Sequence, residues 1–216
     1  MMIPTPDSIA EAADGIRQRI ASAGVDPDRV AILAVTKTFP AEVASAAIDA
    51  GFSMLGENYA AELVDKAQHL GDRAVSWHYL GAIQTNKVAR LAPVTSCFQG
   101  LSRVKEAAAI ARHRPGAGVM VQVDLTGRPE RGGVPPGEVE ALVSAAQQLG
   151  LDVRGLMTVA PDDPGAARLA FREVVRLADG LGLDERSMGM TGDLEIAVEE
   201  GATMVRIGRA LFGARS

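Results

Sequence analysis

Short apolar runs alternate along the chain with stretches whose apolar positions have helical spacing. The first such stretch predicts a helix, because Pro6 suits a first turn capped by Thr5. Its apolar positions recur every three or four residues, at Ile9, Ala13, Ile16 and Ile20. Eight apolar runs then predict strands at residues 31–35, 53–55, 77–80, 97–98, 119–123, 153–157, 187–190 and 204–207.

Amphipathic stretches between these runs predict further helices. One begins near Pro40 and ends before Gly51, and another covers about residues 58–70. The helix after the fifth strand has an apolar face formed by Val139, Leu142, Val143, Ala146 and Leu149. A helix beginning at Asp163-Pro164 is expected to bury Ala167, Phe171, Val174, Val175 and Ala178.

Regular alternation of strands and helices indicates a parallel sheet. Eight strands with a repeat of roughly 25 residues leave room for one helix and two short loops in each unit. We therefore expect an α/β fold, a single (β/α)8 TIM barrel with an extra N-terminal helix, in one domain that covers residues 1–216. An open, doubly wound sheet is the alternative. The one long irregular segment covers residues 127–136.

Composition narrows the classes of function. The net charge of −5 gives no indication of a nucleic acid or an anionic membrane as partner. The first ten residues do not resemble a secretion signal, and no apolar run approaches the roughly 18 residues of a membrane span, so we expect a cytoplasmic protein. Cys97 is the only cysteine, which excludes an internal disulfide, and the three histidines have no metal-ligand spacing.

Candidate chemistry lies where the strands end, because the active sites of parallel barrels form there. Lys37 follows the first apolar strand. Such a lysine is either a solvated strand end or an amine held in a pocket. Removal from water lowers the pKa of an amine, which makes it nucleophilic enough to form a Schiff base near neutral pH.

The last two strands end in loops suited to an anion. Gly208 links the eighth strand to a short helix and leaves the backbone N–H groups open to a phosphate, while Thr191 can add a hydroxyl donor. Arg206 points to the same side of the strand as Gly208. Opposite the ring nitrogen of a pyridine cofactor, a guanidinium can only donate, so it would leave that nitrogen unprotonated. The alternatives are glycines that only form turns, and an ion pair of Arg206 with Asp193 or Glu195.

Several motifs, in order along nearly the whole chain from residue 30, resemble the pyridoxal phosphate homeostasis protein family. They are Ala34-Val35-Thr36-Lys37, Gly56-Glu57-Asn58-Tyr59, Trp77-His78-Tyr79-Leu80-Gly81 with Gln84-Thr85-Asn86-Lys87, Gly155-Leu156-Met157, and the stretch from Ser187 to Gly213. The resemblance implies a barrel related to the N-terminal domain of alanine racemase, with pyridoxal 5′-phosphate (PLP) bound to a lysine. It also implies a role in vitamin B6 balance rather than a known turnover reaction.

Family roles transfer to six positions of this chain. The resemblance implies that Lys37 carries PLP and that Asn58 lies close to the lysine and the ring. It implies a phosphate site at Thr191, Gly208 and Arg209, the last two through backbone N–H groups. It also implies that Arg206 faces the pyridine nitrogen. Two positions depart from the family pattern: Thr191 stands where serine is common, and Arg131 where a lysine is common.

The leading hypothesis is a monomeric protein that holds PLP on Lys37 and exchanges it with PLP-dependent apo-enzymes. The first alternative is a PLP-dependent amino-acid racemase or decarboxylase. Racemases of this type use a tyrosine from a second, β-rich domain, which we do not expect here because the chain ends soon after Gly213. The second alternative is a cofactor-free barrel with Lys37 as an aldolase-type amine. We expect His78 and Cys97 to be core residues rather than catalysts.

Overall fold

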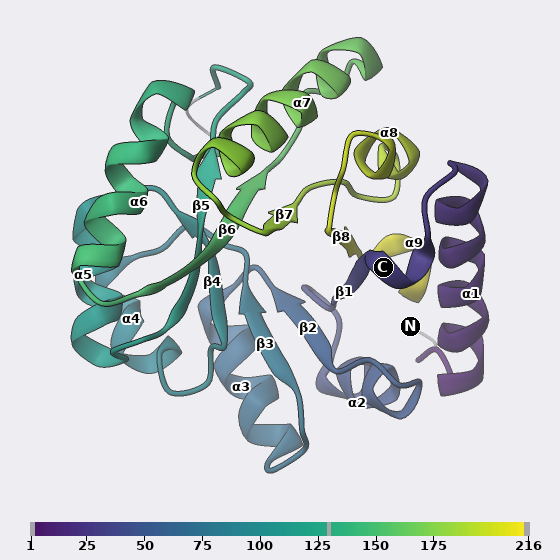
Figure 1. Cartoon of the computed structure of the whole chain (residues 1–216). Coiled ribbons are helices and arrows are strands. Elements are labelled where there is room, and N and C mark those ends of the chain that lie inside the picture. The colour runs from purple at the N-terminus through teal and green to yellow at the C-terminus, as the bar shows by residue number, and fades with distance from the viewer. Residues whose placement is uncertain (1–2, 129–130, 214–216) are drawn as a thin grey trace.

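The computed structural model describes residues 3–128 and 131–213. Eight parallel strands follow one another in sequence order and close into a barrel, with the eighth pairing with the first (Figure 1). The strands are β1 (Ala31–Val35), β2 (Met54–Glu57), β3 (Ser76–Tyr79), β4 (Cys97–Leu101), β5 (Gly118–Val123), β6 (Asp152–Thr158), β7 (Glu185–Ser187) and β8 (Met204–Ile207). The prediction of a (β/α)8 barrel is confirmed, and the open sheet was wrong.

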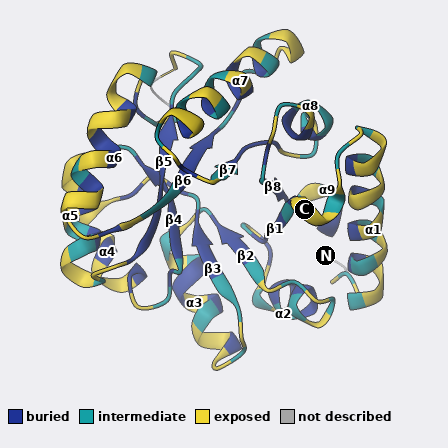
Figure 2. Cartoon of the chain, viewed as in Figure 1, coloured by how far each residue is buried: buried dark blue, intermediate teal, exposed yellow. Residues whose placement is uncertain are grey.

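Helices surround the barrel and turn their buried faces toward it (Figure 2). They are α1 (Pro6–Ser22), α2 (Ala41–Asp49), α3 (Ala60–Leu70), α4 (Thr85–Leu91), α5 (Val104–His113), α6 (Val139–Gln148), α7 (Pro164–Gly180), α8 (Leu194–Glu199) and α9 (Arg209–Phe212). The 3-10 turns η1 (Pro27–Arg29) and η3 (Pro136–Glu138) lie in the loops. None of the helices in the described ranges is long and apolar enough to cross a membrane.

The extra N-terminal helix α1 is confirmed. The Thr5 side chain caps it by accepting a hydrogen bond from the Ser8 N–H at 3.2 Å, and its four predicted apolar positions are buried. The helix packs against α2, α8 and α9. Because α8 and α9 are short, α1 adds cover on the side of the barrel that they leave thinly protected.

Successive side chains of a strand point to opposite faces, and this alternation decides what enters the barrel. The interior holds a cluster of buried apolar side chains, Leu33, Cys97, Met120, Met157 and Met204. The residues between them along the strands pack outward against the helices. On β1, positions in phase with Leu33 therefore face inward and the others face the helices.

Three predicted strands differ from the structure by two or more residues at one or both ends. The seventh was expected at residues 187–190 but is Glu185–Ser187, because its first two residues are polar and Gly189, at φ +92°, turns the chain after it. The second runs to Glu57 and the fourth to Leu101, both further than the apolar runs suggested. Leu149, expected on the buried face of α6, is exposed and follows the end of the helix.

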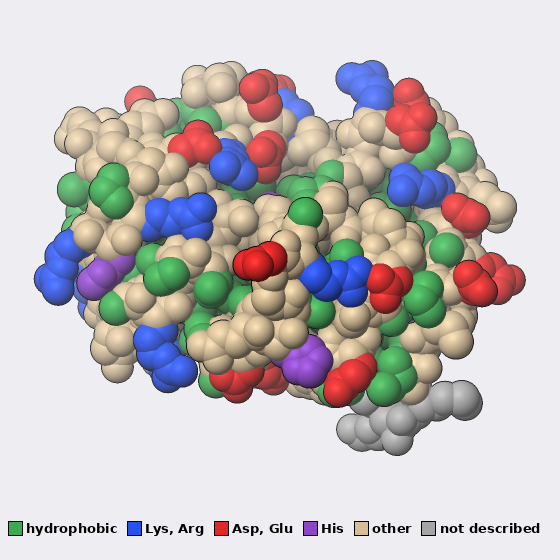
Figure 3. Space-filling model, turned by 90° about the horizontal axis from the view of Figure 1, so that it is seen from below, with side chains coloured by type: hydrophobic (Ala, Val, Ile, Leu, Met, Phe, Trp, Pro, Cys, Tyr) green, Lys and Arg blue, Asp and Glu red, His purple; other side chains and the backbone are tan. Residues whose placement is uncertain are grey.

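Surface charges are mixed on the face seen in Figure 3. Acidic and basic side chains are interspersed there, and apolar side chains lie among them without forming one continuous patch. Clustered Lys and Arg are the usual mark of a surface that binds nucleic acid, and Figure 3 shows no such cluster on this face.

Candidate functional site

A cavity of about 490 Å³ lies at the carboxyl ends of the strands. Its lining includes all six site residues expected from the sequence, Lys37, Asn58, Thr191, Arg206, Gly208 and Arg209. The remaining walls are mostly apolar and include Val35, Leu80 and Met157. Met190, Gly192 and Arg209 on its rim are exposed, so the mouth opens to solvent. The structure thus brings the expected residues together, while the roles assigned to them stay predictions.

Lys37 reaches this cavity because of strand alternation. It is in phase with Leu33 and Val35, whose side chains face the interior and the cavity floor. The chain turns sharply after it, since Thr38 has a positive φ of +67°. The lysine therefore leaves β1 at the point where the strand stops and the cavity begins.

Arg206 on β8 is held by neutral groups. One guanidinium nitrogen, Nη1, donates to the Ser187 carbonyl at 2.6 Å and to its hydroxyl at 3.0 Å, and Nη2 donates to the Thr158 carbonyl at 2.7 Å. Burial lowers the pKa of Arg206 to about 10, and the charge of Asp193 opposes this shift. Arg206 is therefore still charged at neutral pH and can act only as a donor toward the cavity.

The expected alternative for Arg206, an ion pair with Asp193 or Glu195, does not occur among the described contacts. The Glu195 carboxylate instead binds Arg19 of α1, at 2.6 Å. The Asp193 carboxylate accepts a hydrogen bond from the Met190 N–H, also at 2.6 Å. Both carboxylates therefore fix the loop after β7 and leave the guanidinium directed at the cavity.

The two loops expected to bind phosphate lie side by side. Thr191 and Gly192 line the cavity from the loop after β7, and Gly208 and Arg209 line it where β8 passes into α9. Arg19 donates to the Thr191 carbonyl at 3.0 Å, so α1 anchors the first of these loops. The N-terminal helix is thus part of what shapes the site.

Comparisons with known proteins agree with this arrangement. Residues 9–216 match the family model described as alanine racemase, N-terminal domain. The pyridoxal phosphate homeostasis protein of Pseudomonas aeruginosa is 41% identical over 221 residues, which cover 97% of this chain and 95% of the relative. The protein of the same name from Escherichia coli is 34% identical over 223 residues, covering 96% and 95%. The chain belongs to the pyridoxal phosphate homeostasis protein family.

PipY from Synechococcus elongatus has the same fold and is 30% identical to this family member. Its structure without PLP has a TM-score of 0.86 and covers 95% of this chain and 100% of PipY. Its structure with PLP bound has a TM-score of 0.77 and covers 92% and 100%. The fold seen here is therefore shared with a protein that has been solved both with and without PLP.

A chain of hydrogen bonds runs from the cavity into the barrel of this family member. We call Arg206, Ser187, Gln99 and His78 the inner chain. The Ser187 hydroxyl donates to Gln99 Oε1 at 2.7 Å, and Gln99 Nε2 lies 2.8 Å from His78 Nδ1. Burial, with a smaller contribution from Arg154, lowers the pKa of His78 to about 4. A neutral histidine can accept from Gln99, so the structure makes His78 a hydrogen-bonded core residue, as expected.

The other two residues singled out in the sequence lie apart from the cavity around Lys37. Cys97 is buried in the barrel, where burial raises the pKa of its thiol to about 12, so it is not a nucleophile at neutral pH. Arg131 lines a neighbouring cavity of about 560 Å³, which shares Asn58, Leu80, Met157 and Val159 with the first. Residues 129–130 of that loop lie outside the described residues.

Sequence reasoning missed Gln99 and Lys66. Gln99 follows the two apolar residues that marked the fourth strand, and its only signal was a polar residue beside an apolar run. Lys66 lies on a helix where a lysine usually faces water, yet it is buried. In the described ranges, no group of three or more His, Cys, Asp or Glu side chains could hold a metal ion.

Proposed function

We propose that this protein binds PLP in the cavity around Lys37 and takes part in PLP homeostasis. The observation that carries the proposal is the presence of Lys37, Arg206 and the two anion-suited loops in one cavity. A cavity of about 490 Å³ also lies within the usual size of a cofactor site. The names of the curated relatives and the PLP-bound structure of PipY support the same conclusion.

The residues that line the cavity fit the chemical groups of PLP. When bound, PLP supplies an aldehyde that forms a reversible Schiff base with an amine, and a ring that can withdraw electrons. Lys37 offers the amine. Thr191 offers a hydroxyl, and Gly208 and Arg209 offer backbone N–H groups for the phosphate. Arg206 offers a donor for the ring nitrogen, and Asn58 lies on the wall beside the lysine.

We further propose that the protein stores and delivers PLP without rapid amino-acid turnover. A charged Arg206 can donate a hydrogen bond to the ring nitrogen but gives it no proton readily, which weakens the ring as an electron sink. The described residues that line the cavity include no tyrosine, histidine or carboxylate. Racemisation needs proton transfer on both faces of the reacting carbon, and one lysine cannot supply both.

Delivery requires an accessible cofactor, and the exposed rim of the cavity allows one. We propose that the protein acts as a monomer in the cytoplasm and passes PLP to PLP-dependent apo-enzymes. An amine that captures the aldehyde reversibly suits such an exchange. Water can hydrolyse the Schiff base, which restores the lysine amine and releases PLP chemically unchanged.

The test is chemical labelling of the protein loaded with PLP. A visible absorption band should appear, and borohydride should fix a pyridoxyl group that peptide mapping places on Lys37. Lys37→Ala should lose both the band and the label. Pyridoxal, which lacks the phosphate, should bind far more weakly than PLP, because it forgoes charge-assisted hydrogen bonds to the two loops.

Two outcomes would contradict the proposal. A label on Lys66, Lys87 or Lys105 with Lys37 unmodified would place the cofactor elsewhere. Multiple turnover of any common amino acid, abolished by Lys37→Ala, would show that the protein is a racemase or decarboxylase. Transfer of PLP from the loaded protein to an apo-enzyme is the expected result instead.

A further inference from the structure

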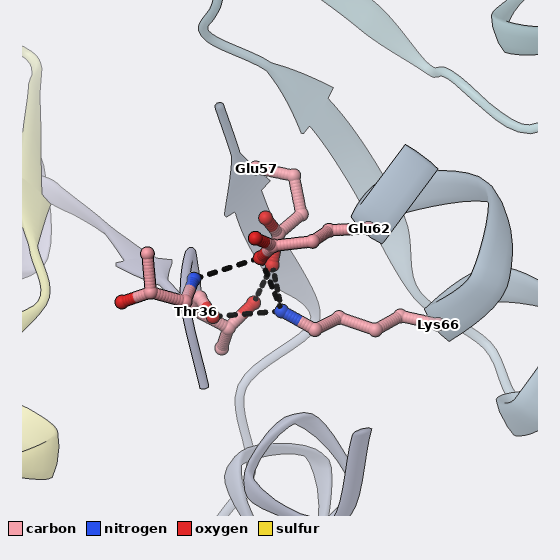
Figure 4. A network of polar contacts seen from close by, with 5 residues as sticks. Thr36, Glu57, Glu62 and Lys66 are labelled. Carbon is pink, nitrogen blue, oxygen red and sulfur yellow. Dashed lines mark hydrogen bonds and ion pairs between the residues drawn. The ribbon is translucent and has the colours of Figure 1, made fainter. Parts of the chain in front are cut away.

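A network of polar and charged side chains joins the ends of β1 and β2 to α3 (Figure 4). Thr36 and Glu57 are in phase with Ala34 and Leu55, which pack toward the helices, so the network lies on the face of the strands away from the cavity. Lys66 of α3 is 4% exposed and Glu57 at the end of β2 is fully buried. Lys66 Nζ lies 2.6 Å from Glu57 Oε1, and the Thr36 hydroxyl donates to the same oxygen at 2.7 Å. We call Thr36, Glu57, Glu62 and Lys66 the outer clamp.

The outer clamp holds both peptide groups of Lys37. Lys66 Nζ donates at 2.8 Å to the carbonyl of Thr36, which belongs to the peptide before Lys37. The Glu62 carboxylate accepts at 2.7 Å from the N–H of Thr38, which belongs to the peptide after Lys37. Lys66 Nζ also lies 3.3 Å from Glu62 Oε2, and this ion pair completes the network. Helix α3 thereby fixes the backbone of Lys37 on both sides.

The conformation of Thr38 shows why such a hold is needed. A φ of +67° is a left-handed conformation that β-branched residues rarely adopt. Backbone strain of this kind persists only where the surroundings over-determine it. Thr38 is exposed, so core packing does not impose its shape. Its backbone N–H instead donates a hydrogen bond to the Glu62 carboxylate, and this contact can hold the left-handed conformation.

The outer clamp joins a helix to the barrel through buried charges, whose removal from water costs free energy. Elsewhere the helices pack on the strands through apolar side chains. Glu57 Oε2 is buried and has no hydrogen-bond partner among the described residues. Replacing a buried ion pair by apolar residues is often neutral or stabilising, so the barrel alone gives no reason to keep these charges.

We infer that Lys66, Glu57 and Glu62 are positioning residues for Lys37. They hold its two peptide groups so that its side chain leaves the backbone in the direction of the cavity. The inference rests on the proposed function, in which Lys37 captures PLP. A backbone that is already held loses no further freedom when the bond to the cofactor forms, and this strengthens binding.

The decisive variants are Glu62→Ala and Glu62→Gln. Glu62 is partly exposed, so both proteins should fold. Glutamine keeps an oxygen that can accept from Thr38, whereas alanine removes it. Glu62→Ala should weaken PLP binding by about tenfold, the usual effect of losing a hydrogen bond to a charged group. Glu62→Gln should stay within about twofold of the unaltered protein. The intensity of the visible band against PLP concentration measures both.

Arg114→Met is the matched control. Arg114 also donates to backbone carbonyls, those of Ala92 and Thr95, but these precede β4 at the opposite end of the barrel from the cavity. Its loss should lower the melting temperature and leave the affinity for PLP unchanged. If Arg114→Met weakens PLP binding as much as Glu62→Ala, the effect reflects general stability and the inference is wrong.

A measurement without PLP separates this inference from the proposed function. The Thr38 amide hydrogen should exchange with solvent faster in Glu62→Ala than in Glu62→Gln, because its acceptor is gone. Equal exchange in the two variants overturns the inference even if no PLP binds. In the converse result, the unaltered protein forms the visible band while Glu62→Ala binds PLP with the same affinity. That result would overturn the inference and leave the proposed function standing.

Discussion

The outer clamp and the inner chain lie on opposite faces of the barrel strands, and they balance their charges differently. In the outer clamp, the Lys66 ammonium is neutralised by the Glu57 and Glu62 carboxylates. In the inner chain, the direct partners of the Arg206 guanidinium are two carbonyls and a hydroxyl. The outer network is thus self-contained and acts through the backbone, whereas the inner one keeps a positive charge available to the cavity.

The hydrogen bonds of the inner chain all run in one direction. Arg206 donates to the Ser187 hydroxyl, and Ser187 donates to Gln99. The Gln99 amide group then donates through Nε2 to His78 Nδ1, so this ring nitrogen must be the acceptor. A protonated His78 could not accept, and burial lowers its pKa, so the folded protein resists a proton there. Burial raises the pKa of Glu57, so the folded protein favours a proton in the outer clamp. The two networks should therefore respond to acid in opposite ways.

The largest effect is expected for Lys66→Met, which leaves the Glu57 carboxylate buried without its cation. The free energy of unfolding at pH 7 should fall by about 3–5 kcal/mol. Burial already raises the pKa of Glu57, against the opposing effect of Lys66. A raised carboxyl pKa costs stability as pH rises, so the deficit of the variant should shrink toward acid. Urea unfolding at pH 7 and pH 5 measures both.

The control for this variant removes both charges. In Lys66→Met combined with Glu57→Leu, the remaining carboxylate, Glu62, is partly exposed and no fully buried charge is left unpaired, so most of the lost stability should return. A single variant that loses less than about 1 kcal/mol at pH 7 would show that the pair is not coupled as its distance suggests.

The inner chain should produce the opposite dependence on pH. The pKa of His78 falls from 6.5 to about 4 in the folded protein. Between these values the unfolded chain binds a proton that the folded one does not, so stability should decrease as pH falls, by up to about 3 kcal/mol. His78→Asn keeps an acceptor for Gln99 but cannot titrate, and its stability should fall less steeply between pH 7 and pH 4. Equal slopes by urea unfolding would contradict the assignment.

The sequence predicted one half of this comparison better than the other. Lys37, Thr191 and Arg206 could be found because strand ends and two-residue alternation place them at one mouth of a barrel. Lys66 could not, because nothing in its own helix shows that Glu57 and the Thr36 carbonyl lie opposite it. Gln99 was missed for the same reason, since its partners are distant in sequence.

The prediction of strand bounds was wrong where a strand begins or ends in polar residues, because these interrupt the apolar pattern. The amino end of β7 is Glu185-Arg186, which no hydrophobic run can mark, yet it pairs with β6. The missed ends of β2 and β4 carry Glu57 and Gln99, one from each buried network. Buried polar residues thus hid the strand ends from the sequence pattern. The same residues form part of the two networks.

The smallest effect is expected for Thr38→Gly, which tests whether the outer clamp works against backbone strain. Glycine adopts positive φ without steric cost, which removes a strain of about 1–2 kcal/mol, but it adds about 0.5–1 kcal/mol of freedom to the unfolded chain. The free energy of unfolding should therefore rise by no more than about 1 kcal/mol. The Thr38→Gly backbone keeps the N–H that Glu62 binds, so the affinity for PLP should fall by less than in Glu62→Ala. Thr38→Ala retains a Cβ atom and should gain none of the stability. If alanine and glycine variants are equally stable by urea unfolding, the left-handed conformation stores no strain, and Glu62 must position Lys37 without opposing any.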